Sequence, residues 1–173
     1  MTVSRPDPPL APDELVSTGS EREVLEAFLD LYRTVVRRKL TGVNDDRVRQ
    51  RLVPSSTTLA GIAKHLAAVE REWFQETLAQ RPSDRSGVPS GGSEWRVGSD
   101  ETIAGLLADY EDACAQSRRT AARFGLDDRV PHPRLGQVSL RWIYVHMIEE
   151  TARHAGHADI LREQTDGAVG FDG

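Results

Sequence analysis

The sequence predicts an all-α fold: a four-helix bundle with a long crossover between its second and third helices. Four long segments repeat apolar residues at helical spacing, and no segment shows a convincing strand pattern. Helices of this kind bury their apolar stripes against one another in a bundle. At 173 residues the chain is long enough for one domain with a buried core. We expect a flexible arm over residues 1–19, the bundle over residues 20–167 and a tail over residues 168–173.

The first predicted helix begins after Ser20, which forms a capping box with Glu23. Apolar residues then recur at spacings of three and four as far as Leu40, where the segment TGVNDD ends the helix. The residues before Ser20 are rich in proline and polar side chains, which is typical of a mobile terminal arm.

The second predicted helix begins after PSSTT and ends before Pro82. The next segment, RPSDRSGVPSGGSEWRVG, is rich in glycine, serine and proline and has no periodicity, so we expect a loop. An extended chain covers roughly 3.3 Å per residue, whereas a helix of about 22 residues is only about 33 Å long. The loop is therefore long enough to cross the whole bundle, and helices two and three can be parallel.

The third predicted helix starts near residues 99–100 and carries Cys114 on its apolar face. The segment GLDDRVPHPRLGQV reads as a second connector. Ser139 is the expected N-cap of the fourth helix. Gly167 is its expected stop, because glycine readily adopts the left-handed conformation that follows many helices.

Composition and charge exclude several classes of partner. The net charge is −5 and there is no basic stripe, which argues against binding to nucleic acid or to an anionic membrane surface. No apolar run approaches the length of a membrane span, and the N-terminal segment lacks the apolar region of a signal peptide. With a single cysteine, Cys114, the chain suits a reducing compartment, so we expect a cytoplasmic protein.

The stretch EETARHAGHAD, residues 149–159, holds two of the five histidines. Residues on a helix advance by about 100° each. His154 therefore lies near the centre of the apolar stripe of the fourth helix, with Glu150 one turn earlier on the same face. His157 and His146 lie at one edge of that stripe.

A second helix also directs an imidazole toward the interior, because His65 lies at the edge of its apolar face. A buried carboxylate is costly unless it is paired or bound to a metal. Glu150 is therefore compatible with a hydrogen bond to His154 or with shared coordination of a metal ion. The residues alone leave both open. Gly156 likewise fits close helix packing or room for a ligand beside His157.

The segments LAGIAKHLAAVEREWF and SLRWIYVHMIEETARHAGHADILREQTDG resemble the DinB superfamily. The likeness is strongest to its uncharacterised actinobacterial branch, with mycothiol-dependent maleylpyruvate isomerase and the mycothiol S-transferases as relatives. The resemblance covers residues 20–167 and implies the bundle described above, with its long crossover. It also implies a divalent metal held by His65, Glu150 and His154; many members have His at the Glu150 position, whereas the isomerase has Glu. His157 falls where many relatives have Gln, which implies a place beside the metal or the substrate.

Two His and one carboxylate leave an open position on Zn²⁺, as in catalytic sites; Ni²⁺, Fe²⁺ or Mn²⁺ could also bind. The resemblance implies a thiol S-transferase in which mycothiol attacks a small electrophile, with His157 as the catalytic histidine. Two alternatives stay open: a metal-dependent hydrolase that uses metal-bound water, and a non-catalytic metal-binding stress protein. The expected partners are a small thiol and an electrophile, and relatives suggest a possible homodimer.

The remaining candidate residues carry weaker signals. Cys114 is expected in the core and not as a nucleophile, because it lies on an apolar face without a basic neighbour in sequence. Trp95, outside any apolar stripe, is a candidate for an interface or a pocket lid. Arg71, Arg153 and Arg162 could bind the sugar part of a thiol or could simply form solvated helix faces.

Overall fold

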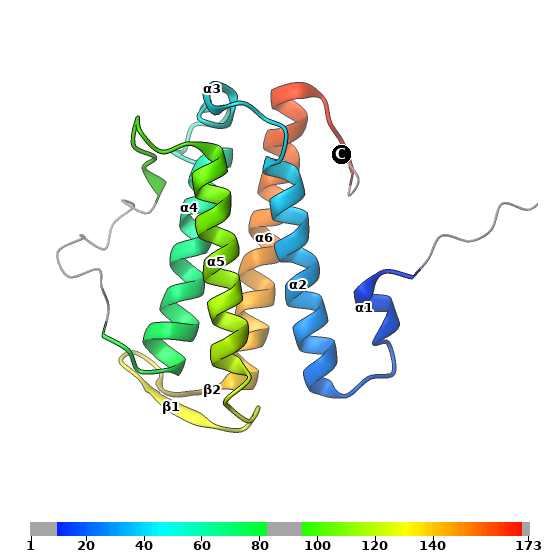
Figure 1. Cartoon of the computed structure of the whole chain (residues 1–173), viewed down its shortest axis with the longest axis vertical. Coiled ribbons are helices and arrows are strands. Elements are labelled where there is room, and N and C mark those ends of the chain that lie inside the picture. The colour runs from blue at the N-terminus through cyan, green and yellow to red at the C-terminus, as the bar shows by residue number, and fades with distance from the viewer. Residues whose placement is uncertain (1–9, 83–94, 171–173) are drawn as a thin grey trace, which may run out of the picture.

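The computed structural model describes residues 10–82 and 95–170, and it is predominantly helical (Figure 1). Residues 1–9 of the predicted arm, 83–94 of the predicted crossover and 171–173 of the predicted tail lie outside the described residues. In chain order the elements are α1 (Pro12–Leu15), α2 (Glu21–Leu40), α3 (Asp45–Val48), α4 (Leu59–Glu70), the π-helix η1 (Arg71–Leu78), α5 (Ile103–Ala121), β1 (Arg129–His132), β2 (Gly136–Ser139) and α6 (Leu140–Asp166). None of the described helices combines the length and apolar content that a bilayer crossing requires.

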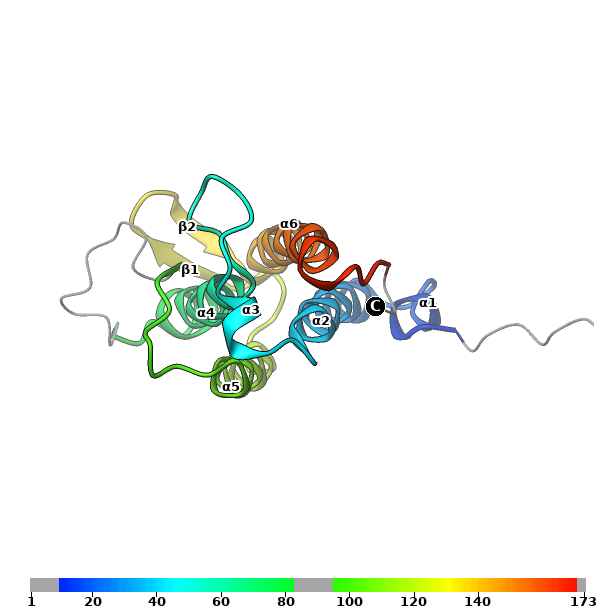
Figure 2. The same ribbon diagram turned by 90° about the horizontal axis from the view of Figure 1, so that it is seen from above.

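The long helices α2, α4, α5 and α6 lie side by side in both views of the molecule (Figures 1 and 2). Figure 1 shows that α2 and α6 run in one direction, whereas α4 and α5 run in the other. Because α4 and α5 are parallel, η1 ends at one end of the helices and α5 begins at the other. A long connection between them is therefore required, as the length of the predicted loop allows.

Several predicted helix ends are confirmed by their capping contacts. Ser20 Oγ accepts a hydrogen bond from Glu23 N, and the Glu23 carboxylate accepts one from Ser20 N at 2.8 Å. At α6, Ser139 is the N-cap and Gly167 follows the last turn with a φ of 80°. The start of α5 corrects the prediction: Thr102 is its N-cap, a few residues later than expected. Ser, Asp and Thr are all common caps, so the sequence alone did not distinguish between them.

The second predicted helix is not α-helical throughout. After Glu70 it continues as the π-helix η1, in which Ala79 N donates to Phe74 O, five residues back. The extra residue per turn brings Trp73, Phe74 and Gln75 to the buried side in succession. Such segments are rare and often mark functional sites, and an apolar pattern read at 3.6 residues per turn does not reveal them.

A two-stranded hairpin corrects the all-α prediction. β1 and β2 pair antiparallel within the segment expected to be a connector, with Val130 opposite Val138. Only these two valines are buried in the hairpin, so the alternating pattern is too short to recognise in sequence. Gly136 has a φ of 74° and turns the chain into the second strand.

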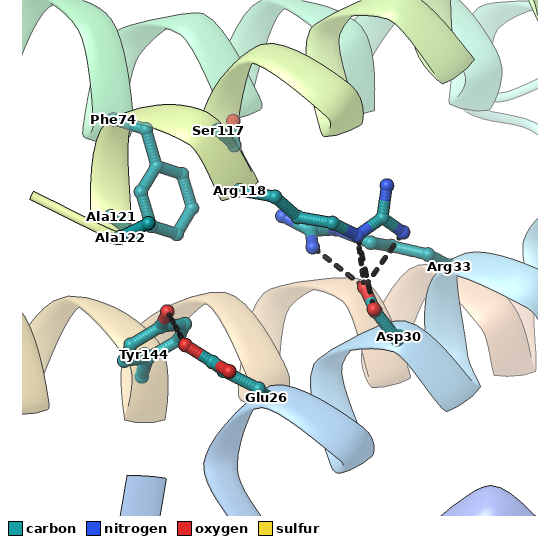
Figure 3. A pocket seen from close by; sticks show the side chains of 9 residues that line it. All are labelled: Glu26, Asp30, Arg33, Phe74, Ser117, Arg118, Ala121, Ala122 and Tyr144. Carbon is teal, nitrogen blue, oxygen red and sulfur yellow. Dashed lines mark hydrogen bonds and ion pairs between the residues drawn. The ribbon is translucent and has the colours of Figure 1, made fainter. Parts of the chain in front are cut away.

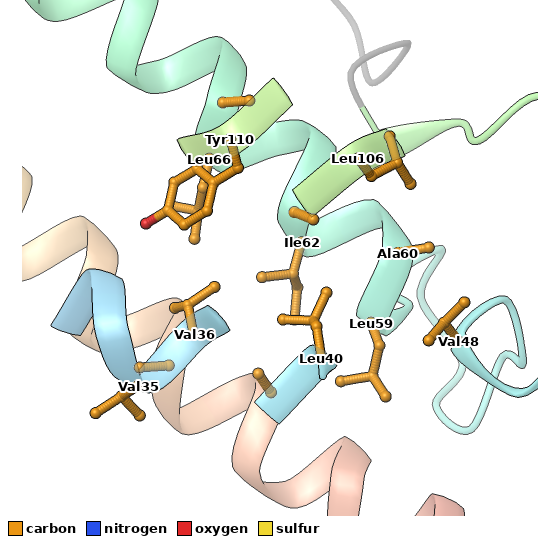
Figure 4. Packing of buried hydrophobic residues seen from close by; sticks show 14 of the residues in the cluster. Val35, Val36, Leu40, Val48, Leu59, Ala60, Ile62, Leu66, Leu106 and Tyr110 are labelled. Atoms are coloured by element: carbon orange, nitrogen blue, oxygen red, sulfur yellow. The ribbon is translucent and has the colours of Figure 1, made fainter. Parts of the chain in front are cut away.

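The apolar core consists of two clusters that follow one another along the helices. One cluster packs the ends of α2, α4, α5 and α6 near α3, around residues such as Leu40, Ile62 and Leu66 (Figure 4). The other packs η1 against the first half of α6 and includes Phe74 and Met147. Between the two clusters the buried positions become polar, and the side chains discussed below come from this region.

A buried ion pair joins α2 to α4 in this polar region. Arg33 Nε and Nη2 donate to the two carboxylate oxygens of Glu70 at 2.8 and 2.6 Å. Arg33 Nη1 also donates to Asp30, which in turn pairs with Arg118 of α5 (Figure 3). A bidentate guanidinium–carboxylate contact of this kind satisfies both oxygens and fixes their geometry.

Candidate metal centre

Three side chains from α4 and α6 converge on one point. His65 Nε2 lies 3.0 Å from Glu150 Oε1, and His154 Nε2 lies 3.1 Å from the same oxygen. The three donor atoms all lie within 4.8 Å of one another. The structure thus brings together the three side chains that the sequence resemblance selects.

The helices explain how these residues meet. Glu150 and His154 are four residues apart, so they occupy the same face of α6 one turn from each other. His65 comes from α4, which packs against α6 at this level. The His65 and His154 rings are 4.9 Å apart and meet edge to face. The approach of the two helices, which the sequence cannot show, therefore completes the cluster.

The Glu150 carboxylate is held on both sides. Its Oε1 faces the two imidazoles, and its Oε2 accepts a hydrogen bond from Arg153 Nη1 at 3.1 Å. Hydrogen bonds from His154 and His65 hold the pKa of Glu150 well below its usual range, although burial opposes this shift. The carboxylate is therefore charged and available as an anionic ligand.

His157 contacts the cluster through His154. The Nδ1 atoms of the two rings lie 3.4 Å apart, and the rings meet edge to face. Burial and the charge of His154 both lower the pKa of His157, which favours a neutral ring. A neutral His157 Nδ1 can accept a hydrogen bond from His154 Nδ1, and this contact would hold the His154 ring in its orientation.

The Trp95 ring packs against the ring of His65. The two rings are stacked with centroids 4.2 Å apart and an angle of 16°. The segment that carries Trp95 is attached to α4, because Lys64 Nζ donates to the Arg96 carbonyl at 2.9 Å. Gly61 permits this approach, since a Cβ there would lie only 3.1 Å from the Trp95 carbonyl oxygen. The predicted lid residue is thus a stacking partner of a candidate ligand.

The donor set fits a divalent metal ion. Two imidazole nitrogens and one carboxylate oxygen are common zinc ligands, and donors on one ion with bonds of about 2.0–2.2 Å lie about 3–4 Å apart. His65 Nδ1 is buried and has no hydrogen-bond partner in the described part of the chain. A buried nitrogen without a partner is costly, so hydrogen bonding among the described residues does not fully account for the position of the His65 ring.

A known protein-family model matches most of the chain. Residues 24–167 match the family model described as Mycothiol-S-transferase. The chain belongs to the mycothiol S-transferase family. This match confirms the predicted membership of the DinB superfamily, and it extends from the first turn of α2 to the end of α6. No curated protein matches the chain.

The structure places the other candidate residues outside the cluster. His146 stacks on Trp142 and lies 4.5 Å from the Trp73 ring, in an aromatic group beside the hairpin. Cys114 is buried in the core, as predicted, and burial raises the pKa of its thiol well above the usual range. Gly156 faces open space, so the close helix packing that was one of its two interpretations is not observed.

The three arginines considered for thiol binding are engaged in ion pairs. Arg71 pairs with Asp109, Arg162 pairs with Asp166, and Arg153 pairs with both Glu149 and Glu150. The interpretation as solvated, paired helix faces is favoured for Arg71 and Arg162. Arg153 has a more specific role, because it orients the carboxylate of a candidate ligand. Its position three residues after Glu150 is the sequence signal that could have indicated this contact.

Proposed function

We propose that the protein is a metal-dependent transferase that joins a small thiol, mycothiol, to a small electrophile. The observation that carries this proposal is the convergence of two imidazole nitrogens and one carboxylate oxygen in a chain of this family. The proposed ligands are His65, Glu150 and His154, in a DinB-like four-helix bundle formed by residues 20–167. Zinc is the expected ion, with Ni²⁺, Fe²⁺ or Mn²⁺ as alternatives. A cytoplasmic location and a homodimer stay predictions.

A divalent ion held by these residues would lower the pKa of a thiol at its open position and fix the sulfur beside the electrophile. The new bond forms between that sulfur and the electrophilic carbon, and the thiol proton leaves to water. At the same time the carbon loses either its bond to a leaving group or its π bond to a neighbouring atom, and the electron pair of that bond goes to the departing group or the neighbouring atom, which can then take a proton from water. Glu150 contributes its negative charge, which Arg153 keeps in place. The protein supplies no nucleophile of its own in this scheme, because Cys114 is buried and its raised pKa keeps the thiol protonated.

His157, the predicted catalytic histidine, acts in this proposal through His154. Its Nδ1 atom accepts the His154 Nδ1 proton, and this contact fixes the tautomer and the orientation of the ligand ring. An imidazole with such a partner is also a stronger ligand. Trp95 has the corresponding role for His65, because stacking limits rotation of the ring where a hydrogen-bond partner for Nδ1 is missing among the described residues.

The test combines metal analysis with a conjugation assay. Purified protein is analysed for bound metals, and then consumption of a panel of small electrophiles is followed with mycothiol, without thiol, and with mycothiol plus a chelator. We expect stoichiometric divalent metal and a turnover that requires both the thiol and the metal. The matched control is His146→Phe, which removes an imidazole one turn from Glu150 but keeps a stacked ring.

Three results would contradict the proposal in different ways. Electrophile consumption that is equally fast without thiol would replace the transferase by a metal-dependent hydrolase. Stoichiometric metal without turnover across the panel would favour a non-catalytic metal-binding protein. Turnover that survives complete removal of the metal would reject the metal site itself.

A further inference from the structure

A hollow lies between η1 and α5, and none of the residues that line it belongs to the candidate metal centre. It has a volume of about 350 Å³, which is within the range of about 300–1,000 Å³ typical of small-molecule sites. Its lining is entirely polar or basic and consists of Gln75, Arg81, Gln116, Arg119, Thr120 and Arg123.

The residues that line this hollow carry a positive charge, whereas the chain as a whole is acidic. Three arginines line it, and no carboxylate is among the lining residues, although the net charge of the chain is −5. Other arginines of α5 and η1 are paired: Arg118 binds Asp30, and Arg71 binds Asp109. Among the described residues, no carboxylate forms an ion pair with the three arginines of the hollow. Their positive charge is thus available to a ligand.

Gln75 adds a buried donor to the three arginines. Its side chain is only 7% exposed, and Thr120 Oγ1 donates to its Oε1 atom at 3.0 Å. This hydrogen bond fixes the amide so that the Nε2 atom is left as a donor. Nε2 is buried and has no acceptor within the described ranges. A buried donor without an acceptor is costly, and a small rotation of the Gln75 amide toward an anion in the hollow would satisfy it.

The backbone around the hollow is held in an uncommon conformation. Gln75 lies in the π-helix, and the next turn contains Gln80 with a φ of 52°. Gln80 is kept there by hydrogen bonds from its Nε2 to the carbonyls of Thr77 and Pro131. As a result, the Arg81 amide donates back to the Gln75 carbonyl at 3.0 Å. Left-handed non-glycine residues often occur at functional sites, and this one brings Arg81 to the hollow.

We propose that this hollow binds the phosphate group of a small molecule. Guanidinium groups bind phosphate oxygens through paired, charge-assisted hydrogen bonds, and the Gln75 amide supplies a further donor. The helix dipole accounts for basic residues in the last turn of α5. It does not account for Arg81, which follows η1 in the chain, or for the amide without an acceptor.

The test is titration of the full-length protein with inorganic pyrophosphate and, separately, with the phosphomonoester glycerol phosphate, followed by calorimetry at constant ionic strength. We expect saturable binding, weakened at least about tenfold by the double variant Arg119→Gln/Arg123→Gln and by Gln75→Met. The matched control is Arg38→Gln/Arg134→Gln, which removes the same charge from two exposed arginines outside the hollow. Binding stronger for the phosphomonoester would identify an esterified metabolite, and binding stronger for pyrophosphate a diphosphate.

A further arm separates this site from the metal. In the His154→Ala variant, pyrophosphate binding should persist and remain sensitive to Arg119 and Arg123. Three results would overturn the proposal: equal weakening by the control pair, which would indicate net charge alone; loss of binding in His154→Ala, which would place the anion at the metal; and no saturable binding by the wild type. Circular dichroism of each variant shows that a loss of binding does not arise from unfolding.

Discussion

The Arg33–Glu70 pair and the cluster around Glu150 each join two long helices, and they are built differently. In the first, Arg33 and Glu70 are 6% and 1% exposed, and each carboxylate oxygen of Glu70 has its own guanidinium donor. In the second, His65 and His154 both face a single oxygen of Glu150, and the side chains of Glu150 and His65 are 13% and 14% exposed.

The difference teaches how a stabilising ion pair can be distinguished from a functional centre. The Arg33–Glu70 pair is complete, since its donors and acceptors match, and it contains no group that a ligand could use. The Glu150 cluster is incomplete: three potential lone pairs converge, and a buried imidazole nitrogen has no partner among the described residues. A buried ion pair whose hydrogen bonds are all made within the protein therefore indicates a structural role. Several potential metal-binding atoms that converge and are partly exposed to solvent indicate a binding site.

The strongest test of this comparison removes a proposed ligand. Loss of a residue that only hydrogen-bonds to a metal ligand lowers metal affinity by about 10–100-fold. His154→Ala removes a proposed ligand itself, so we expect a larger loss of metal affinity and no thiol-dependent turnover. Folding should be retained, because the Arg33–Glu70 pair and both core clusters remain. Metal content and turnover are measured beside His146→Phe. Full metal retention in His154→Ala would show that the cluster around Glu150 is a structural network, as the Arg33–Glu70 pair is.

Removal of Glu70 tests the opposite cluster. Glu70→Ala leaves the Arg33 guanidinium buried without its main partner, so we expect a loss of about 3–5 kcal/mol in the free energy of unfolding. Urea denaturation measures this loss, and the metal affinity of the folded protein should not change. In the double variant Arg33→Met/Glu70→Leu most of the stability should return, because apolar residues can replace a buried pair. Weakened metal binding in that double variant would show that the two clusters are coupled.

His157→Ala is expected to have a smaller effect at the metal centre. The ligand His154 remains but loses the partner of its Nδ1 atom. We therefore expect a decrease in metal affinity of about 10–100-fold and slower turnover at saturating metal. Competition with a chromophoric chelator gives the affinity. His157→Gln keeps an acceptor and should recover part of both properties; equal loss in Ala and Gln variants would argue against the hydrogen bond as the cause.

Substitution of Trp95 should lower metal affinity less than substitution of His157. Trp95→Ala removes the ring that stacks on His65, and we expect metal affinity to fall by a few-fold, on the order of 1 kcal/mol or less. The absorption spectrum of the Co²⁺-substituted protein should also change, because the orientation of a ligand ring changes. Trp95→Phe should restore both, whereas Trp142→Ala, which removes a tryptophan stacked on His146 instead, should alter neither.

Substitution of Cys114 should have no measurable effect on turnover. The thiol is buried and its pKa is raised by burial, so native protein should react with iodoacetamide only as fast as it unfolds. Cys114→Ala should cost on the order of 1 kcal/mol of stability and leave the transfer rate unchanged. Rapid alkylation of the native protein, with loss of turnover, would return Cys114 to consideration as a nucleophile.

Local sequence patterns predicted where the long helices lie, apart from the start of α5 and the π-helical end of the second helix, and the family resemblance selected the candidate ligands. Helix periodicity and caps are local properties, so Ser20 and Ser139 could be recognised as N-caps and Gly167 as a stop. The spacing of Glu150 and His154 is also local, because residues four apart on a helix share a face. The place of His65 in the cluster came from the family resemblance and not from any local rule.

The packing of the helices sets which partner each buried charged side chain meets. Glu70 and Glu150 are both acidic residues on long helices, and nothing local shows that one meets a guanidinium and the other two imidazoles. The hairpin, the π-helix and the stacking of Trp95 on His65 were equally hidden, because each depends on contacts between segments distant in sequence or on a backbone geometry outside the usual periods. Helix packing sets which side chains meet, and it is this meeting that separates a structural ion pair from a candidate metal centre.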